Sequence, residues 1–374
     1  MHMIEVTIVG SINTDLMCYT DKFPIPGETI VGAKFATEFG GKGANQCVAA
    51  RKLGAKTSLV SRVGDDYFGR DYIEYLKRVG VETDTIKISH TANSGVAVIT
   101  VERDYGNNNI VIIPGANEEI SVDDVEEAHS KGLISKKVME CQFESNAEAT
   151  LYALEQAKKR GLITILDPAP APSPGSLFLP LLKRFMEAST MVCPNETEAA
   201  VLTGIPVPDF VGKSSFQIAE SALEWLLHLE EAGVTYPLVT LGANGVVGLL
   251  PKCEGDSTRA DDVTMLKSDL ITSDKAIFHI RCPVYSKVVD TTGAGDCFAG
   301  SLAFYMARYP EITIVEKLRR SVWIASQSVL RHGTQASFYE RHELPDELFE
   351  SAEFRWPQTS DTCILKPFVE KILP

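Results

Sequence analysis

Short apolar runs alternate with longer amphipathic segments along most of this 374-residue chain, and this alternation limits the folds that the chain can adopt. Runs with the length and composition of buried strands lie at 6–9, 57–60, 138–141, 164–166, 191–193 and 238–241. Helical patterns lie between them at 69–79, 147–160 and 216–229, and the first two are closed by Gly80 and Gly161. Strands that alternate with helices are typical of βα units, so the sequence predicts an α/β fold with a mainly parallel central sheet flanked by helices.

Two segments, 13–40 and 93–115, break this rhythm. They alternate apolar with polar residues and contain no long helical pattern. Such alternation predicts antiparallel or half-exposed strands. We expect these strands to form a small sheet apart from the main one, suited to a lid or an interface.

The rest of the chain is assigned to the α/β core, which comprises 1–12, 41–92 and 116–374. One irregular stretch of this core, at about 252–287, mixes acidic residues with scattered apolar ones. We interpret the stretch as a surface insertion that is ordered in part by a strand near 276–280.

The charge of the chain argues against two classes of partner. Fifty acidic residues outnumber 36 basic ones, which gives a net charge of −14 at pH 7, and no basic run offsets it. Neither a nucleic acid nor an anionic membrane is therefore expected as a partner. No apolar run approaches the roughly 20 residues that a membrane-spanning helix needs.

The eight cysteines stand singly between Cys18 and Cys363, without a C-x-x-C pair. This spacing predicts neither a zinc ribbon nor a disulfide framework. The first residues lack the basic lead and the long apolar segment of a secretory signal. We therefore expect a reducing, cytoplasmic location.

A glycine-rich turn at 290–296, DTTGAGD, leads directly into an apolar helical pattern. Glycine lets backbone N–H groups face a ligand at the positive end of the helix dipole, so 293–295 can cradle an anion. Asp296, fixed beside that cradle, can accept a proton from a hydroxyl while the cradle holds charge on a transferring phosphoryl group. The alternative is that Asp296 only caps the helix.

A second glycine-rich turn, FGGKGANQ at 39–46, precedes another helix and carries Lys42 and Asn45. It is not a Walker A loop, because a glycine follows Lys42 where that motif has Ser or Thr. A near match at 212–214 lacks the first glycine of the motif, since Val207 stands there. No G-x-G-x-x-G opens a helix after a strand, so neither standard nucleotide-binding motif applies.

Six motifs follow one another along the chain: GSINTD at 10–15, PGE at 26–28, GGKGANQ at 40–46, NETE at 195–198, TLGANG at 240–245 and DTTGAGD at 290–296. Together they resemble the ribokinase-like (PfkB) family of carbohydrate kinases, which also includes fructokinases and adenosine kinase. The resemblance implies a Rossmann-like α/β core with a small β-sheet lid that closes over a sugar. It also implies ATP-dependent phosphorylation of D-ribose at the 5-hydroxyl. The alternatives are a kinase for deoxyribose, another pentose or a nucleoside, and a non-catalytic sugar-binding regulatory protein.

The resemblance also implies roles for individual residues. Asp296 is the base, and the amides of Gly293, Ala294, Gly295 and Asp296 form the anion hole. The residues expected to bind the sugar are Asn13, Asp15, Gly41, Lys42, Asn45, Glu144 and Asp296. Those expected to bind ATP are Asn195, Glu198, Thr240, Gly242 and Gly245, the first two also placing Mg²⁺. The expected site for K⁺, a monovalent activator, comprises Asp290, Thr292, Ser328, Arg331, Gly333 and Ser337. The family further implies a homodimer through the lid sheet.

Simpler roles remain open for several of these residues. Asn13 and Asp15 could be turn formers, and Glu144 could be a surface carboxylate. Lys42 could be a solvated lysine of a loop. The pair formed by residues 195 and 198 could serve only to cap a helix that begins there.

Overall fold

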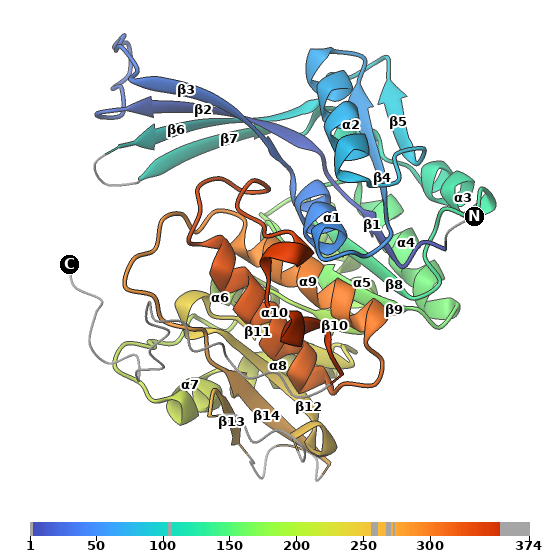
Figure 1. Ribbon diagram of the computed structural model, residues 1–374, viewed down its shortest axis with the longest axis vertical. Coiled ribbons are helices and arrows are strands. Elements are labelled where there is room, and N and C mark those ends of the chain that lie inside the picture. The colour runs from blue at the N-terminus through green and yellow to red at the C-terminus, as the bar shows by residue number, and fades with distance from the viewer. Residues whose placement is uncertain (1–2, 104–106, 256–260, 267–270, 272–273, 352–374) are drawn as a thin grey trace.

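The computed structural model describes residues 3–103, 107–255, 261–266, 271 and 274–351. These residues form one large and one small β-sheet, and helices pack on both faces of the large sheet (Figure 1). The predicted α/β fold with a mainly parallel central sheet is confirmed. In the described ranges, no helix combines the length and the apolar character that crossing a membrane requires.

The large sheet has ten strands within the described residues, in the order β13-β14-β12-β11-β10-β9-β8-β1-β4-β5. Their bounds are β1 (Val6–Val9), β4 (Thr57–Gly64), β5 (Ile86–Ser89), β8 (Val138–Gln142), β9 (Ile163–Asp167), β10 (Met191–Val192), β11 (Tyr236–Thr240), β12 (Val246–Pro251), β13 (Val263–Leu266) and β14 (Lys275–Ile280). Neighbouring strands from β5 to β11 run parallel, whereas β12, β14 and β13 extend one edge in antiparallel fashion. The βα units expected from the sequence form the parallel part.

The helices cover the large sheet in groups. They are α1 (Lys42–Lys52), α2 (Tyr67–Val79), α3 (Val122–Ser130), α4 (Ala147–Lys159), α5 (Leu182–Ala188), α6 (Glu196–Thr203), α7 (Ser215–Ser221), α8 (Leu223–Glu231), α9 (Ala294–Arg308) and α10 (Ile314–Ser328). One face packs against α1, α2, α9 and α10, the other against α3, α4 and α5, and the end near β11 and β12 against α6, α7 and α8. The pattern predicted as one helix at 216–229 is interrupted at Ala222, between α7 and α8.

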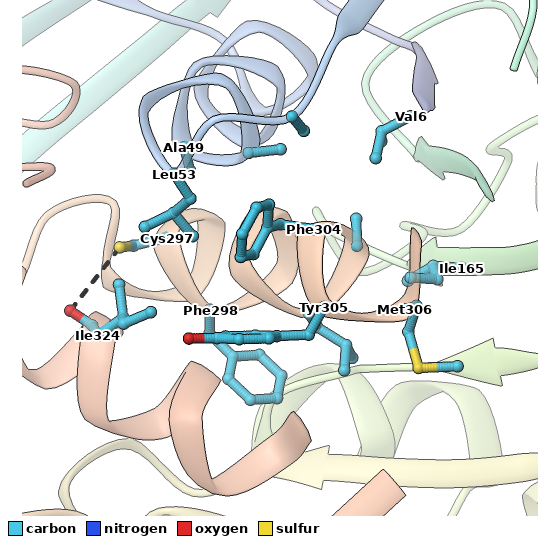
Figure 2. Close-up of a cluster of buried hydrophobic side chains, with 14 of the residues drawn as sticks. Val6, Ala49, Leu53, Ile165, Cys297, Phe298, Phe304, Tyr305, Met306 and Ile324 are labelled. Carbon is cyan, nitrogen blue, oxygen red and sulfur yellow. Dashed lines mark hydrogen bonds between the residues drawn. The ribbon is translucent and has the colours of Figure 1, made fainter. Parts of the chain in front are cut away.

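Strand β1 shows why both faces of the sheet are covered. Val6 and Ile8 point to one face and Val9 to the other, and none of the three is exposed. On the first face, Leu53, which directly follows α1, and Phe304 of α9 belong to the same buried cluster (Figure 2). Each large apolar side chain buried in this way contributes about 1.5 to 3 kcal/mol. The packing of α1 against α9 places the first turns of these two helices next to each other.

The interpretation of 252–287 as a surface insertion is wrong for Asp262 and for residues 276–280. The expected strand near 276–280 is present as β14, but it lies between β12 and β13, and none of its residues from 276 to 280 is more than 1% exposed. Asp262 is buried as well, and Arg319 of α10 offsets the cost by donating two hydrogen bonds of 2.8 Å to its carboxylate. Residues 256–260, 267–270 and 272–273, like the tail 352–374, lie outside the described residues.

The small sheet consists of β2 (Asn13–Thr20), β3 (Lys34–Gly40), β6 (Gly95–Glu102) and β7 (Asn108–Ile113), in the order β3-β2-β6-β7. The pairs β2/β3 and β6/β7 are antiparallel, as expected, whereas the central pair β2/β6 is parallel. Figure 1 shows the sheet extending away from the α/β body. Strand β7 is exposed along its whole length, including the apolar residues Ile110 and Val111. An exposed apolar edge strand is typical of an interaction surface.

Candidate active site

Polar side chains gather at the carboxyl ends of β8 and β9, beside the first turn of α1. Strand β8 ends at Gln142 and β9 ends at Asp167. Gln46 of α1 connects the two, since its Nε2 donates to Asp167 Oδ2 at 2.7 Å and its Oε1 accepts from Gln142 Nε2. The carboxyl ends of parallel strands are the usual ligand-binding edge of an α/β sheet.

Helices α1 and α9 each begin at a glycine with a positive φ. The two are Gly41, with φ 85°, and Gly293, with φ 73°. A Cβ atom at position 41 would lie 2.6 Å from the Asn13 amide nitrogen, and one at position 293 would lie 2.4 Å from Thr334 Cγ2. Glycine is therefore required at both positions, and it lets the chain turn tightly into helices whose N–H groups face the site.

Several amides at the start of α9 are free to bind an anion. Among the described residues, the N–H groups of Gly293, Gly295 and Asp296 donate no hydrogen bond. The Ala294 amide donates to the Thr291 carbonyl at 3.2 Å. Unpaired N–H groups at a helix N-terminus carry partial positive charge, so this turn can hold a negatively charged group.

Asp296 lies in the first turn of α9 and is 6% exposed. Its Oδ2 accepts a hydrogen bond from Asn45 Nδ2 at 2.8 Å, and its Oδ1 accepts one from Gln46 Nε2 at 3.0 Å. The alternative of a capping role does not apply, because Gly293 is the N-cap and no side chain caps this end of α9. The two amide donors hold the carboxylate in one orientation beside the free N–H groups.

Sequence reasoning missed the side chains that position Asn45 and Asp296. Gln335 Nε2 donates to Asn45 Oδ1 at 2.7 Å, from a loop far along the chain. Gln46 and its partner Asp167 support Asp296 from the other side. Gln46 stands in the GGKGANQ motif, and Gln335 stands between Gly333 and Ser337 of the expected K⁺ site, so both could have been found there, whereas Asp167 occurs in a stretch that carries no local signal.

Lys42 is surrounded by acidic groups. Burial alone would lower the pKa of its ammonium group, but four carboxylates outweigh this effect and raise the pKa above its usual value. They belong to Asp296, Asp167, Glu144 and Glu198. Burial also raises the pKa of Asp167 above its usual range, and the charge of Lys42 opposes that shift. Lys42 is therefore a protonated group that offsets several negative charges, rather than a solvated lysine of a loop.

The residues expected to bind a sugar surround this centre. Asn13 and Asp15 lie on β2, so they are strand residues and not turn formers. Glu144 is half-buried, and its Oε2 accepts hydrogen bonds from the Ser11 hydroxyl at 2.6 Å and from the Lys42 amide at 3.0 Å. Glu144 therefore fixes the start of α1, which excludes a role as a mere surface carboxylate.

Asp15 is poised to change its protonation near neutral pH. Burial raises its pKa to about 7, and the carboxylates of Glu144, Glu38 and Asp296 add to the shift. The side chain lies against the backbone of Gly40, where a Cβ atom would be 2.4 Å from Asp15 Oδ2. The charge of this face of the small sheet therefore depends on pH.

Asn195 and Glu198 form the capping pair of α6, which is one of the two roles that the sequence left open for these residues. Asn195 Oδ1 accepts from the Glu198 amide and Glu198 Oε2 accepts from the Asn195 amide, both at 2.9 Å. A β-bridge joins Asn195 to Thr240 at the end of β11, so the two residues lie side by side at one edge of the sheet. Glu198 also contributes to the electrostatic field at Lys42, which links this edge to the centre.

Two glycines of the TLGANG motif have different surroundings. Gly242 is exposed at the start of the short 3-10 helix η3 (Gly242–Asn244), and a Cβ atom there would meet nothing within 4 Å. Gly245 is buried, and its Cβ atom would lie 2.0 Å from the Ile280 carbonyl oxygen of β14. Gly242 is open to a ligand, whereas Gly245 is required for packing against β14.

Asp290 organises the loop expected to bind K⁺. Its Oδ1 accepts from the Thr292 amide at 2.9 Å and hydroxyl at 2.7 Å, and its Oδ2 accepts from the Gly333 amide at 3.0 Å. Although burial opposes the shift, these hydrogen bonds lower the pKa of Asp290. Within the described part of the chain, the carbonyl oxygens of Thr292, Arg331 and Gly333 accept no hydrogen bond. Oxygen atoms of this kind suit a hard cation.

The side chains of the other expected ligands are engaged elsewhere. Arg331 donates to Glu343 at 2.9 Å and lies 3.5 Å from the ring centroid of Tyr339. The hydroxyls of Ser328 and Ser337 donate to backbone carbonyls at 2.8 and 2.7 Å. No group of three or more His, Cys, Asp or Glu residues in the described ranges is placed to hold a metal ion. A cation in this loop would therefore depend mainly on backbone oxygens and Asp290.

Comparison with known proteins identifies the family to which the chain belongs. The sequence model of the pfkB family of carbohydrate kinases matches residues 3–341, which include all six motifs. The chain belongs to the pfkB family. The resemblance that the motifs predicted is therefore confirmed, and with it the assignment of the chain as a kinase.

Individual pfkB relatives match over almost their whole length. A ribokinase of Mus musculus is 41% identical over 347 residues, which are 92% of this chain and 94% of the relative. A deoxyribokinase of Salmonella typhi is 31% identical over 339 residues, which are 90% and 95% of the two chains. The solved structure of Arabidopsis thaliana ribokinase complexed with ribose and ATP superposes with a TM-score of 0.72 at 28% identity, covering 91% of this chain and 97% of that one. Ribokinase from Giardia lamblia has a TM-score of 0.73, with the same identity and coverage.

Proposed function

We propose that this pfkB-family chain is an ATP-dependent kinase that phosphorylates D-ribose at its 5-hydroxyl to give ribose 5-phosphate and ADP. The observation that carries the proposal is the fixed carboxylate of Asp296 in the first turn of α9, beside free backbone amides. The identity of 41% with mouse ribokinase and the fold shared with a ribokinase complexed with ribose and ATP support the choice of substrates.

The chemistry follows from the geometry at the start of α9. Asp296 accepts the proton of the 5-hydroxyl while the hydroxyl oxygen attacks the γ-phosphorus of ATP. The free amides of Gly293, Gly295 and Asp296 stabilise the negative charge on the phosphoryl group as it is transferred. Because these donors are in place before the reaction, they need no reorganisation during it. The protonated Lys42 balances charge between the sugar and the phosphates.

The sugar is held by groups on both sheets. Asn13 and Asp15 of β2 approach it from the small sheet, while Gly41, Lys42, Asn45, Glu144 and Asp296 approach it from the core. Hydrogen bonds between sugar hydroxyls and the charged members of this set, namely Lys42 and the carboxylates, contribute about 1.5 to 3 kcal/mol each. On this proposal, the segments 13–40 and 93–115 act as a lid, and closure of the lid over ribose excludes water from the transfer.

The ATP phosphates bind on the side of Asn195, Glu198, Thr240 and Gly242, and we assign the accompanying divalent ion as Mg²⁺. Asn195 and Glu198 would hold that ion, which would offset the charge of the triphosphate. The residues that would hold K⁺ are Asp290 and the residues with unpaired carbonyl oxygens, Thr292 and Gly333, and the site would also include residues 328, 331 and 337. In that loop Asp290 and Gly333 fix the backbone next to the anion hole.

Steady-state ADP release tests the proposed function. With Mg-ATP, turnover is expected with ribose, more weakly with 2-deoxyribose, and not with fructose or adenosine, and KCl is expected to give higher rates than NaCl. Preference for 2-deoxyribose would move the assignment toward the activity named in the Salmonella typhi relative. Tight ribose binding without ADP release in any buffer would support a non-catalytic sugar-binding regulatory protein instead.

Ribose affinity is expected to depend on the protonation of Asp15. The pKa of this carboxyl is about 7, and only the ionised form accepts hydrogen bonds at both oxygens. The dissociation constant of ribose is therefore expected to be about tenfold larger at pH 6 than at pH 8, because the competent fraction falls as pH falls through the pKa. Calorimetric titration of ribose at both pH values, without nucleotide, measures the effect. In Asp15→Asn the dependence should disappear, and an equal dependence in both proteins would assign it to another group.

We propose a cytoplasmic homodimer that forms through the small sheet. The exposed apolar residues of β7 support this assembly, as does the edge position of that strand. Cys47, Cys141, Cys193 and Cys297 are buried free thiols, which is compatible with a reducing compartment. Sedimentation equilibrium should give twice the chain mass, and a monomer at working concentrations would exclude the dimer.

A further inference from the structure

One side chain of the small sheet reaches the loop of Gly333 in the core. It is Glu38 of β3, and a Cβ atom at position 333 would lie 2.9 Å from Glu38 Oε2 and 3.5 Å from its Cδ. The carboxylate of Glu38 therefore lies directly over the backbone of Gly333. Among the described residues, Glu38 forms neither a side-chain hydrogen bond nor an ion pair.

The core presents a second carboxylate to the same stretch of backbone. The Gly333 amide donates to Asp290 Oδ2 at 3.0 Å, while the Gly333 carbonyl accepts no hydrogen bond within the described ranges. Tyr19 of β2 lies within the electrostatic influence of both carboxylates. Burial raises the pKa of its phenol, and the charges of Glu38 and Asp290 raise it further. Glu38 of the small sheet and Asp290 of the core thus both place a carboxylate next to this loop, which is unfavourable unless a positive charge joins them.

Glu38 is also linked to the residues that hold the sugar. In the pairing of β2 with β3, Glu38 lies directly opposite Asp15, and Asn13 lies opposite Gly40 two positions further along. Side chains at opposed positions share one face of a sheet. Asn13, Asp15 and Glu38 therefore belong to one rigid pair of strands, so a movement that brings Asp15 to a sugar also brings Glu38 to Gly333.

We propose that Glu38 couples sugar binding to monovalent cation binding. When the small sheet lies on the core, the carboxylate of Glu38 adds negative charge beside Asp290 and the free carbonyl of Gly333, and K⁺ binds more tightly. By thermodynamic linkage, K⁺ then tightens sugar binding by the same factor. The inference rests on the proposed function, which supplies the sugar and the cation, and it assigns to Glu38 a positioning role rather than contact with the reacting atoms.

Calorimetric titration of ribose without nucleotide tests the coupling. The dissociation constant is measured in KCl and in tetramethylammonium chloride at equal ionic strength, for the wild type and for Glu38→Gln. In the wild type, K⁺ is expected to tighten ribose binding about fivefold or more. In Glu38→Gln this ratio should fall toward one, and Glu38→Asp should restore part of it because the charge is kept.

A matched control is Glu102→Gln, which removes the same charge from the same sheet at the far end, opposite Thr20. It is expected to keep the ratio of the wild type. If ribose binds but K⁺ has the same effect on the wild type and on Glu38→Gln, or no effect on the wild type, the coupling is wrong while the kinase assignment stands. If the wild type binds no ribose in either salt, the proposed function fails and the coupling fails with it.

Discussion

Replacing Asp296 with asparagine is expected to lower kcat about 10²- to 10⁴-fold, the usual contribution of a positioned general base. The substitution keeps the size of the side chain but removes the group that accepts the proton of the sugar hydroxyl. The amides at the start of α9 remain, so a residual rate from charge stabilisation is expected. Single-turnover measurements with Mg-ATP and ribose separate this loss in the chemical step from changes in binding.

The hydrogen bonds of Asp296 define the control for this variant. Both carboxylate oxygens accept from amide donors, of Asn45 and Gln46, so an asparagine would direct its own NH₂ group at one of these donors. Part of the loss could then come from misplacement. Asn45→Ala removes one donor but keeps the carboxylate, so its kcat should fall much less than that of Asp296→Asn. If Asp296→Asn keeps more than about a tenth of the wild-type kcat, the residue is not the general base.

The architecture of the core was predictable because its strands are buried on both faces. Strand β1 shows the effect, since alternate residues enter different clusters and the run reads VTIV. Strand β14 was misplaced because its acidic flank was taken as a surface signal. The charge of Asp262 in that flank is neutralised by Arg319, which lies 57 positions away along the chain. A local sequence pattern cannot predict a partner at that separation.

The candidate site likewise has parts that the sequence predicts and parts that it does not. The turns at 39–46 and 290–296 each contain, within a few residues, a glycine with positive φ and the start of the helix that follows it. Their amides and the position of Asp296 could be predicted for that reason. Gln335 bonds to Asn45 across 290 positions, and Asp167 bonds to Gln46 across 121. These supports arise when the sheet and helices assemble, so a linear pattern does not contain them.

Glu140 is a further group that the sequence did not single out, and its replacement is expected to stabilise the protein. It lies in the middle of β8, between Ile8 of β1 and Ile165 of β9, and is 0% exposed. Among the described residues, neither of its carboxyl oxygens has a hydrogen-bond partner. Burial, followed by the nearby carboxylates of Asp167 and Asp296, raises the pKa of Glu140 well above 4.5. The folded protein therefore keeps this carboxyl neutral.

The sign of the pH effect follows from proton binding. Above pH 4.5, the ordinary pKa of a glutamate side chain, the unfolded chain releases this proton while the folded protein retains it. The folded state then binds more protons, so the free energy of unfolding falls by about 1.4 kcal/mol per pH unit until the folded pKa is reached. Glu140→Gln has no ionisable group at this position and lacks that loss. Between pH 6 and pH 8, the stability of Glu140→Gln relative to the wild type is expected to rise with pH, by at most about 1.4 kcal/mol per pH unit.

Urea unfolding at pH 6, 7 and 8 measures this difference. Asp15 and Asp167, whose pKa values are also raised, are present in both proteins, so their contributions cancel. Glu148→Gln is the matched control, because it removes an exposed carboxylate from α4 and should leave the pH dependence unchanged. A stability difference between Glu140→Gln and the wild type that stays constant from pH 6 to pH 8 would mean that the carboxyl ionises as readily in the folded protein as in the unfolded chain. Glu140 would then need a compensating partner in the folded state, since a bare carboxylate cannot remain charged between two isoleucines.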